Sequence, residues 1–102
     1  MEQRYYFRED IVSIFDCDTE FMEQLEDEDL ISSVESDIPA QRDFPPDQVE
    51  RIRIITNLVR DLGVNLPGAA VIMEMRENMI LMTEQFDRIL EALTEQMRGR
   101  RS

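Results

Sequence analysis

The last third of the chain carries a regular repeat of apolar residues, which limits the folds that are open to this sequence. Seven apolar residues recur there at alternating steps of three and four positions. They are Ile72, Met75, Met79, Met82, Phe86, Ile89 and Leu93. An alternation of this kind predicts one long helix with a single apolar seam, as in a coiled coil or a long packed helical hairpin. We refer to these seven residues as the seam.

The helix that carries the seam is predicted over residues 67–97. A helix of about 30 residues is about 45 Å long, which exceeds what a domain of 102 residues can cover with its own core. The seam therefore predicts a homodimer. Ile80, Leu90 and Met97 widen the seam, which suits packing against more than one helix. The methionines are interpreted as core residues and not as metal ligands, because methionine fills irregular gaps in cores.

The start of the chain predicts two short helices around a tight turn. Apolar residues recur at helical spacing over residues 7–15, and Asp18 or Thr19 can cap a second helix. This arrangement predicts a helix-turn-helix unit that ends near Ile31. The second helix also has a polar face, which we refer to as the acidic face. It consists of Glu20, Glu23, Gln24 and Asp27.

Two weak strand signals follow, at residues 31–34 and 40–44, and they predict a small hairpin. A third helix is then expected to begin at Pro46 or Asp47, since proline is common in the first helical turn. Gly63 is expected to end this helix in a left-handed conformation.

Charge is distributed unevenly along the chain. The net charge is −12, from 23 acids and 11 bases, and every base is arginine. Residues 9–37, which we refer to as the acidic segment, contain twelve acids and no base. The remaining acids and bases cancel, because 23 − 12 leaves 11 acids against 11 bases. Most charge runs are solvated surface, but a surface of this kind also attracts basic partners.

The sequence offers little that could support catalysis. It has no histidine, and its single cysteine, Cys17, lies between Asp16 and Asp18, whose charges would raise the pKa of the thiol. It also has no glycine-rich phosphate loop and no Gly-x-Ser-x-Gly motif. We therefore expect that the protein is not an enzyme and that it binds no cofactor and no metal ion.

The hydropathy of the chain bears on its cellular location. No run approaches the about 18 apolar residues of a membrane span. Residues 1–5 also lack the apolar core of a signal peptide. We therefore expect a cytoplasmic protein without membrane contact.

The order of these elements, together with three motifs, resembles the MerR family. The motifs are Arg-Asp-Phe at residues 42–44, Val-Glu-Arg-Ile at 49–52, and Leu-Val-Arg-Asp-Leu-Gly-Val-Asn-Leu-Pro-Gly at 58–68. The resemblance covers nearly the whole chain. It implies a mainly α fold, in which a MerR-like winged helix-turn-helix domain (residues 1–66) precedes a long C-terminal dimerisation helix with a basic tail (67–102).

The connector at residues 58–68, which leads into a helix with Met75 and Met79, is most similar to the CbpM branch of this family. Proteins of that branch are chaperone modulators. They bind the J-domain of DnaJ/CbpA-like co-chaperones and restrain their action on DnaK. The resemblance therefore implies a J-domain co-chaperone as the partner.

The second helix departs from DNA-binding members of the family, which carry Arg, Lys and Tyr there. Affinity for duplex DNA comes largely from bases that neutralise phosphates, and carboxylates in their place would repel the phosphates. We therefore expect DNA not to be a partner, and expect the acidic face to contact the J-domain. Another surface, such as the third helix or the dimer groove, is the alternative contact. The alternative functions are a DNA-binding transcriptional regulator, a scaffold for another basic protein, and a DNA mimic.

Overall fold

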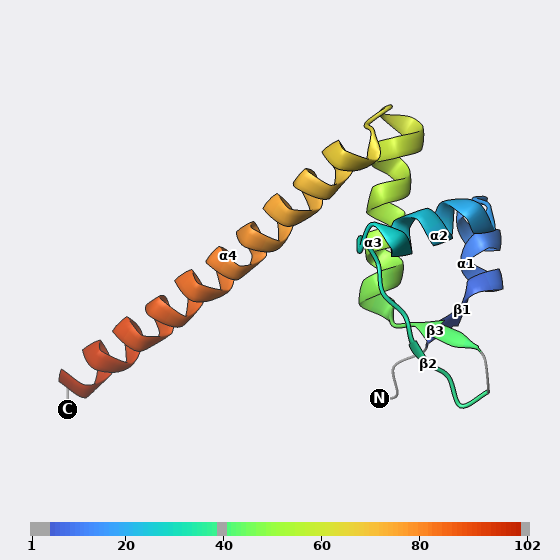
Figure 1. Ribbon diagram of the computed structural model, residues 1–102. Helices are drawn as coiled ribbons and strands as arrows, with labels where there is room; N and C mark the ends of the chain where they lie inside the picture. The colour runs from blue at the N-terminus through green and yellow to red at the C-terminus, as the bar shows by residue number, and fades with distance from the viewer. Residues whose placement is uncertain (1–4, 39–40, 101–102) are drawn as a thin grey trace. The chain divides into compact units, whose positions relative to one another are not determined.

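The computed structural model describes residues 5–38 and 41–100 (Figure 1). The described residues up to Ala70 form one compact unit, and those from Val71 onward form a second. The elements in chain order are β1 (Tyr6–Phe7), α1 (Arg8–Phe15), α2 (Thr19–Asp27), β2 (Val34–Glu35), β3 (Arg42–Phe44), α3 (Pro46–Thr56), the π-helix η1 (Asn57–Asp61) and α4 (Leu66–Arg100).

The predicted helix-turn-helix is present as α1 and α2. Asp16 ends α1 in a left-handed conformation, with φ of 49°. The side chain of Asp18 then caps α2, because its Oδ1 accepts a hydrogen bond of 2.7 Å from the backbone N–H of Phe21. Such a cap satisfies one of the free donors at the start of a helix. The prediction that Asp18 or Thr19 caps the second helix is therefore confirmed, with Asp18 as the cap.

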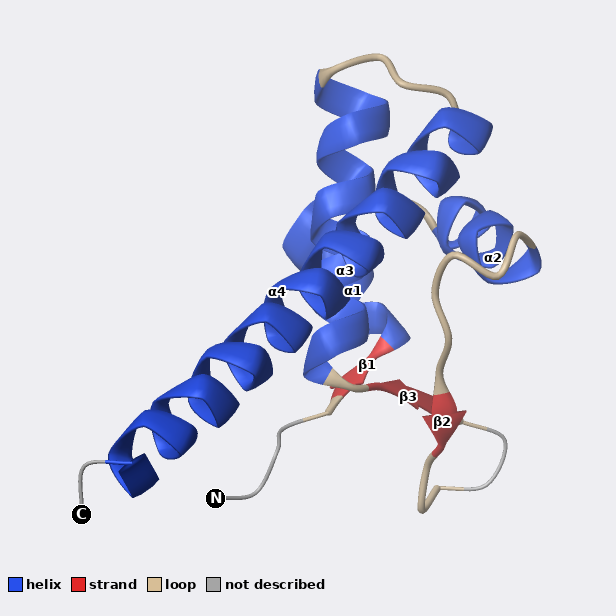
Figure 2. Cartoon of the chain, turned by 90° about the vertical axis from the view of Figure 1, so that its left-hand side faces the viewer, coloured by secondary structure: helices blue, strands red, loops and turns tan. Residues whose placement is uncertain are grey.

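The hairpin is also present, within a three-stranded antiparallel sheet of order β1-β3-β2 (Figure 2). Tyr6 of β1 lies opposite Phe44 of β3, and Glu35 of β2 lies opposite Arg42. The second predicted strand, residues 40–44, is observed over Arg42–Phe44, while Ala40 lies outside the described residues. The first predicted strand, residues 31–34, overlaps the observed β2 only at Val34. Ile31 is instead a buried core residue that precedes β2.

The core of the first unit draws on α1, α2 and α3, on the segment that follows α2, on the central strand and on the first turn of α4. Its buried apolar residues are Ile11, Met22, Leu25, Leu30, Ile31, Phe44, Ile52, Ile55 and Ala69. Full burial of a side chain such as leucine or phenylalanine contributes about 1.5–3 kcal/mol. These contacts fix α2 by its inner face, on which Met22 and Leu25 lie, and leave its outer face to solvent.

The third helix differs from the single α-helix that the sequence predicts. After α3 ends at Thr56, η1 continues as one wider turn, in which the N–H of Leu62 donates to the carbonyl of Asn57 five residues earlier (3.2 Å). Gly63 then adopts φ of 70°, so the predicted left-handed stop is confirmed. The apolar pattern does not report which carbonyl each backbone N–H reaches, so the sequence did not reveal η1.

The long C-terminal helix is confirmed as α4, which is one continuous helix (Figure 1). It begins one residue earlier and ends three residues later than predicted. Asn65 caps its start, since Oδ1 accepts a hydrogen bond of 2.8 Å from the N–H of Gly68. Within residues 5–38 and 41–100, no helix combines the length and the apolar character that crossing a membrane requires.

Candidate protein-binding surface

The outer side of α2 presents the acidic face to solvent. Glu20, Glu23, Gln24 and Asp27 are all exposed. Their spacing of three, four and seven positions places them on one side of the helix, opposite the buried pair Met22 and Leu25. The structure therefore brings the four predicted residues together on one open surface.

The acidic segment is mostly free of neutralising partners. Eleven of its twelve acids are exposed, and Glu26 is half-buried. Glu26 is also the one acid of the segment that pairs with a described base, with Oε1 2.6 Å from Nη2 of Arg8. Asp10 and Asp18 accept backbone hydrogen bonds from Phe7 (3.1 Å) and Phe21 (2.7 Å). The remaining acids are exposed and form no ion pair with an arginine of the described residues.

The arginines of the first unit, by contrast, are engaged within the protein. Five of them lie among the described residues: Arg8, Arg42, Arg51, Arg53 and Arg60. Two form ion pairs with carboxylates, Arg8 with Glu26 and Arg53 with Glu50. Because these guanidinium groups already have anionic partners, they add little free positive charge to the surface.

The other three arginines donate to backbone carbonyls. Arg42 donates to the carbonyl (2.7 Å) and the hydroxyl (2.6 Å) of Ser33, which ties the two arms of the hairpin together. Arg51 donates to the carbonyl of Leu30 (2.8 Å). Arg60 donates to the carbonyls of Phe15 (2.8 Å) and Asp16 (2.7 Å) at the end of α1. The guanidinium groups of these three arginines therefore connect separate segments of the first unit.

The turn between the two helices contains the single cysteine. Cys17 is half-buried, and its thiol pKa is raised, chiefly by burial, with Asp18 and Asp16 adding to the effect and Arg60 opposing it. The predicted direction is confirmed, although desolvation exceeds the effect of the two neighbouring charges. A thiol of this kind is a poor nucleophile near neutral pH.

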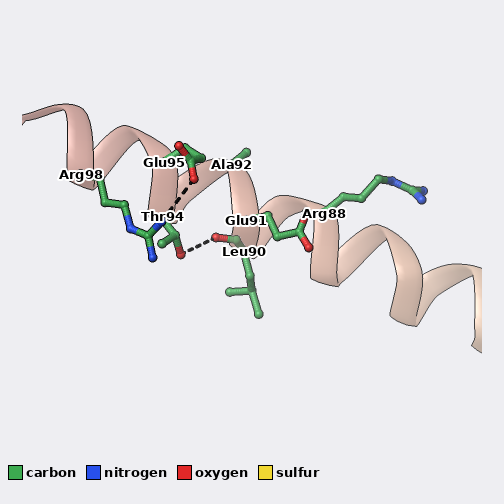
Figure 3. A pocket seen from close by; sticks show the side chains of 7 residues that line it. All are labelled: Arg88, Leu90, Glu91, Ala92, Thr94, Glu95 and Arg98. Atoms are coloured by element: carbon green, nitrogen blue, oxygen red, sulfur yellow. Dashed lines mark hydrogen bonds and ion pairs between the residues drawn. The ribbon is translucent and has the colours of Figure 1, made fainter.

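A second surface lies along α4. All seven residues of the seam are exposed, from 37% for Ile72 to 67% for Met82. Ile80, Leu90 and Met97 are exposed beside them, whereas Met73 is buried. Figure 3 shows part of this helix, where Leu90 lies among polar side chains and Arg98 pairs with Glu95 at 3.5 Å. Large exposed apolar surfaces of this kind mark interaction sites.

Residues 7–91 match the family model described as MerR HTH family regulatory protein. The chain belongs to the MerR family. No significant match was found among curated proteins or among solved structures. The predicted fold is confirmed: a MerR-like winged helix-turn-helix, with α1 and α2 as the two helices and β2–β3 as the wing, is followed by a long C-terminal helix.

Membership of the MerR family makes the charge of α2 informative. In DNA-binding members this helix carries bases, whereas here it carries Glu20, Glu23, Glu26 and Asp27 and no base. The engagement of Arg8, Arg51 and Arg60 was not foreseen from the sequence. Their partners lie up to 45 residues away in the chain, a separation that no local pattern reveals.

Proposed function

We propose that this MerR-family protein is a chaperone modulator of the CbpM type. It binds the J-domain of a DnaJ/CbpA-like co-chaperone through the acidic face of α2 and restrains the action of that co-chaperone on DnaK. One observation carries the proposal. Within the part of the chain that the structure describes, the exposed carboxylates on the outer side of α2 have no ion-pair partner, and each arginine before α4 is bonded within the protein.

The mechanism we propose is competition between two acidic surfaces for one basic helix. The second helix of J-domains is basic and forms the docking site for DnaK. A row of carboxylates such as Glu20, Glu23 and Asp27 complements that charge, steers the encounter and sets the register of the complex. A J-domain held in this way cannot present the same helix to DnaK. No chemical step and no cofactor are required.

The seam supplies the second part of the proposal, a homodimer. One chain leaves the seven apolar side chains in contact with water. Pairing with a second α4 would remove that apolar surface from water, and burial of this kind is the dominant favourable contribution to most protein association. Each dimer would then present two acidic faces, one on each α2.

A DNA-binding regulator is the second candidate, because family membership favours it. The charge of α2 opposes it, since affinity for duplex DNA depends on bases that neutralise phosphates. A gel-shift assay at low salt separates the two functions. A retarded complex with genomic fragments would favour the regulator, and free DNA throughout would favour the modulator.

The decisive experiment measures stimulation of the DnaK ATPase by a J-domain co-chaperone, with and without this protein. We expect the stimulation to fall as the protein is added, while the basal ATPase rate of DnaK alone stays unchanged. Direct binding to the isolated J-domain should weaken steeply as salt rises, because exposed charges are screened. Salt-insensitive binding would instead indicate an apolar interface, and unchanged stimulation would contradict the proposal.

A further inference from the structure

Three consecutive positions of the seam are methionines, and we refer to them as the seam methionines. Met75, Met79 and Met82 are 58%, 66% and 67% exposed. Their steps of four and three positions place them on one side of α4. One side of this helix therefore holds three thioether groups, which are soft and polarisable, and a single chain leaves all three open to solvent.

The buried methionines of the same chain provide a contrast. Met22 is fully buried in the first unit. Met73 is 1% exposed, although it lies on α4 only two positions before Met75. An oxidant must reach the sulfur atom before it can convert methionine to the sulfoxide. The seam methionines are therefore open to a dissolved oxidant, whereas Met22 and Met73 are shielded from it.

We propose that the seam methionines form an oxidation site, at which peroxides convert them to methionine sulfoxide and thereby separate the dimer. The thioether sulfur attacks one oxygen of hydrogen peroxide, the O–O bond breaks and a sulfur–oxygen bond forms. The proton of the transferred hydroxyl passes to the departing hydroxide, which leaves as water. The sulfur loses two electrons, and the peroxide gains them. The effect on pairing rests on the homodimer of the proposed function and does not involve the J-domain.

Oxidation changes this part of the seam from apolar to polar. A thioether packs well in an apolar interface, whereas a sulfoxide oxygen requires hydrogen bonds that water supplies. Each unpaired polar group that becomes buried costs about a factor of ten in the association constant. One sulfoxide from each chain should therefore raise the Kd of the dimer about a hundredfold, and oxidation of all three positions should raise it further.

Pairing and oxidation compete for the same side chains. The dimer would cover the seam methionines, while the free chain exposes them. Oxidation would therefore proceed through the free chain and would prevent that chain from pairing again. An oxidised chain would carry one acidic face, where the dimer carries two.

The first test follows the oxidation of each methionine by mass spectrometry of peptides. It uses protein with Cys17→Ser, so that the only thiol does not react with peroxide. At a tenth of the dimer Kd about 85% of the chains are free, whereas at ten times the Kd about 20% are free. The seam methionines should therefore react about fourfold faster in the dilute sample, while Met22 and Met73 should react slowly in both. Equal rates at the two concentrations, or seam rates no faster than that of Met73, would overturn the proposal.

The second test measures the mass of the same protein by light scattering, at a concentration between the Kd values of the reduced and the oxidised dimer. The mass should halve after treatment with hydrogen peroxide. Methionine sulfoxide reductases for both sulfoxide epimers, with a dithiol that supplies two electrons and two protons per sulfoxide, should restore it. An unchanged mass in protein whose seam methionines are all oxidised would refute the proposal.

Matched variants assign the effect to the seam. Replacement of all three seam methionines by leucine nearly conserves the apolar volume, so this variant should pair and stay paired in peroxide. The control, Met22→Leu with Met73→Leu, keeps the seam methionines and should dissociate in peroxide as the parent protein does. Dissociation of the first variant, or resistance of the second, would contradict an oxidation site at the seam.

The same measurements distinguish this failure from that of the proposed function. If the oxidised protein remains a dimer, only the oxidation switch is refuted. If the protein is a monomer at every concentration before oxidation, the homodimer and the switch are both refuted, while binding of the J-domain is still decided by the ATPase assay.

Discussion

Charge reversal on α2 tests the proposed interface most directly. Glu20 and Glu23 are exposed and have no ion-pair partner among the described residues, so their replacement by lysine leaves the core intact. Each exposed ion pair contributes about 0.2–1 kcal/mol. Reversal removes that attraction and adds a repulsion of similar size. Over two positions the loss is about 2 kcal/mol, which corresponds to about a thirtyfold rise in Kd for the J-domain.

The control places the same charge change elsewhere. Glu84 and Glu91 are exposed on α4, where the seven-residue period puts both opposite the seam. Glu84→Lys with Glu91→Lys alters the net charge as much as Glu20→Lys with Glu23→Lys does. Titration calorimetry at one low salt concentration should show a large loss of affinity for the α2 variant and a small loss for the α4 variant.

Two results would refute the reasoning. Wild-type affinity in the α2 variant would show that this face does not contact the J-domain. An equal loss in both variants would show that net charge alone governs binding. Circular dichroism of the α2 variant serves as a check, because a lysine at Glu20 meets the positive end of the helix dipole at a cost of about 0.3–1 kcal/mol.

Three further predictions concern the turn, the seam and the thiol. Arg60→Met removes two hydrogen bonds to the end of α1 and should lower the free energy of unfolding in urea by about 1–2 kcal/mol; a loss no larger than that of Arg88→Met would contradict this. Met79→Glu combined with Phe86→Glu should halve the mass measured by light scattering, whereas an unchanged mass would refute pairing through the seam. The midpoint of the pH dependence of Cys17 alkylation should lie above that of an unfolded peptide, because burial raises the thiol pKa; a lower midpoint would be inconsistent. Since this pKa is higher in the folded state, its stabilising contribution is present at low pH and is lost as pH rises through the folded-state value.

Local chemistry allowed several elements to be predicted from the sequence. Asp18 begins α2 because a carboxylate can accept from a free N–H two or three residues on, and this holds wherever the helix packs. Gly63 ends η1 because glycine tolerates positive φ. Both residues act within one turn of their own position. The acidic face could also be predicted from local sequence, because helical spacing alone places its four residues on one side of α2.

Tertiary contacts decided what the sequence could not predict. The two residues of β1 form a strand only because Tyr6 and Phe7 pair with β3, and an isolated pair of residues carries no period. Arg51 and Arg60 look like free bases in the sequence, yet they bond to carbonyls 21 to 45 residues away. The surroundings of Cys17 also combine distant segments, because Thr56 and Arg60 line the same hollow as the turn between α1 and α2.

The acidic segment also affects the stability of the free protein. Eleven exposed carboxylates within 29 residues repel one another, and self-repulsion of this kind destabilises a compact state. Added salt should therefore stabilise the unbound fold while it weakens the complex with a basic partner. The bound partner would relieve the same repulsion that salt relieves, so it would act as a folding ligand as well as a target. At low ionic strength the protein would then be least stable alone and most stabilised by a basic partner.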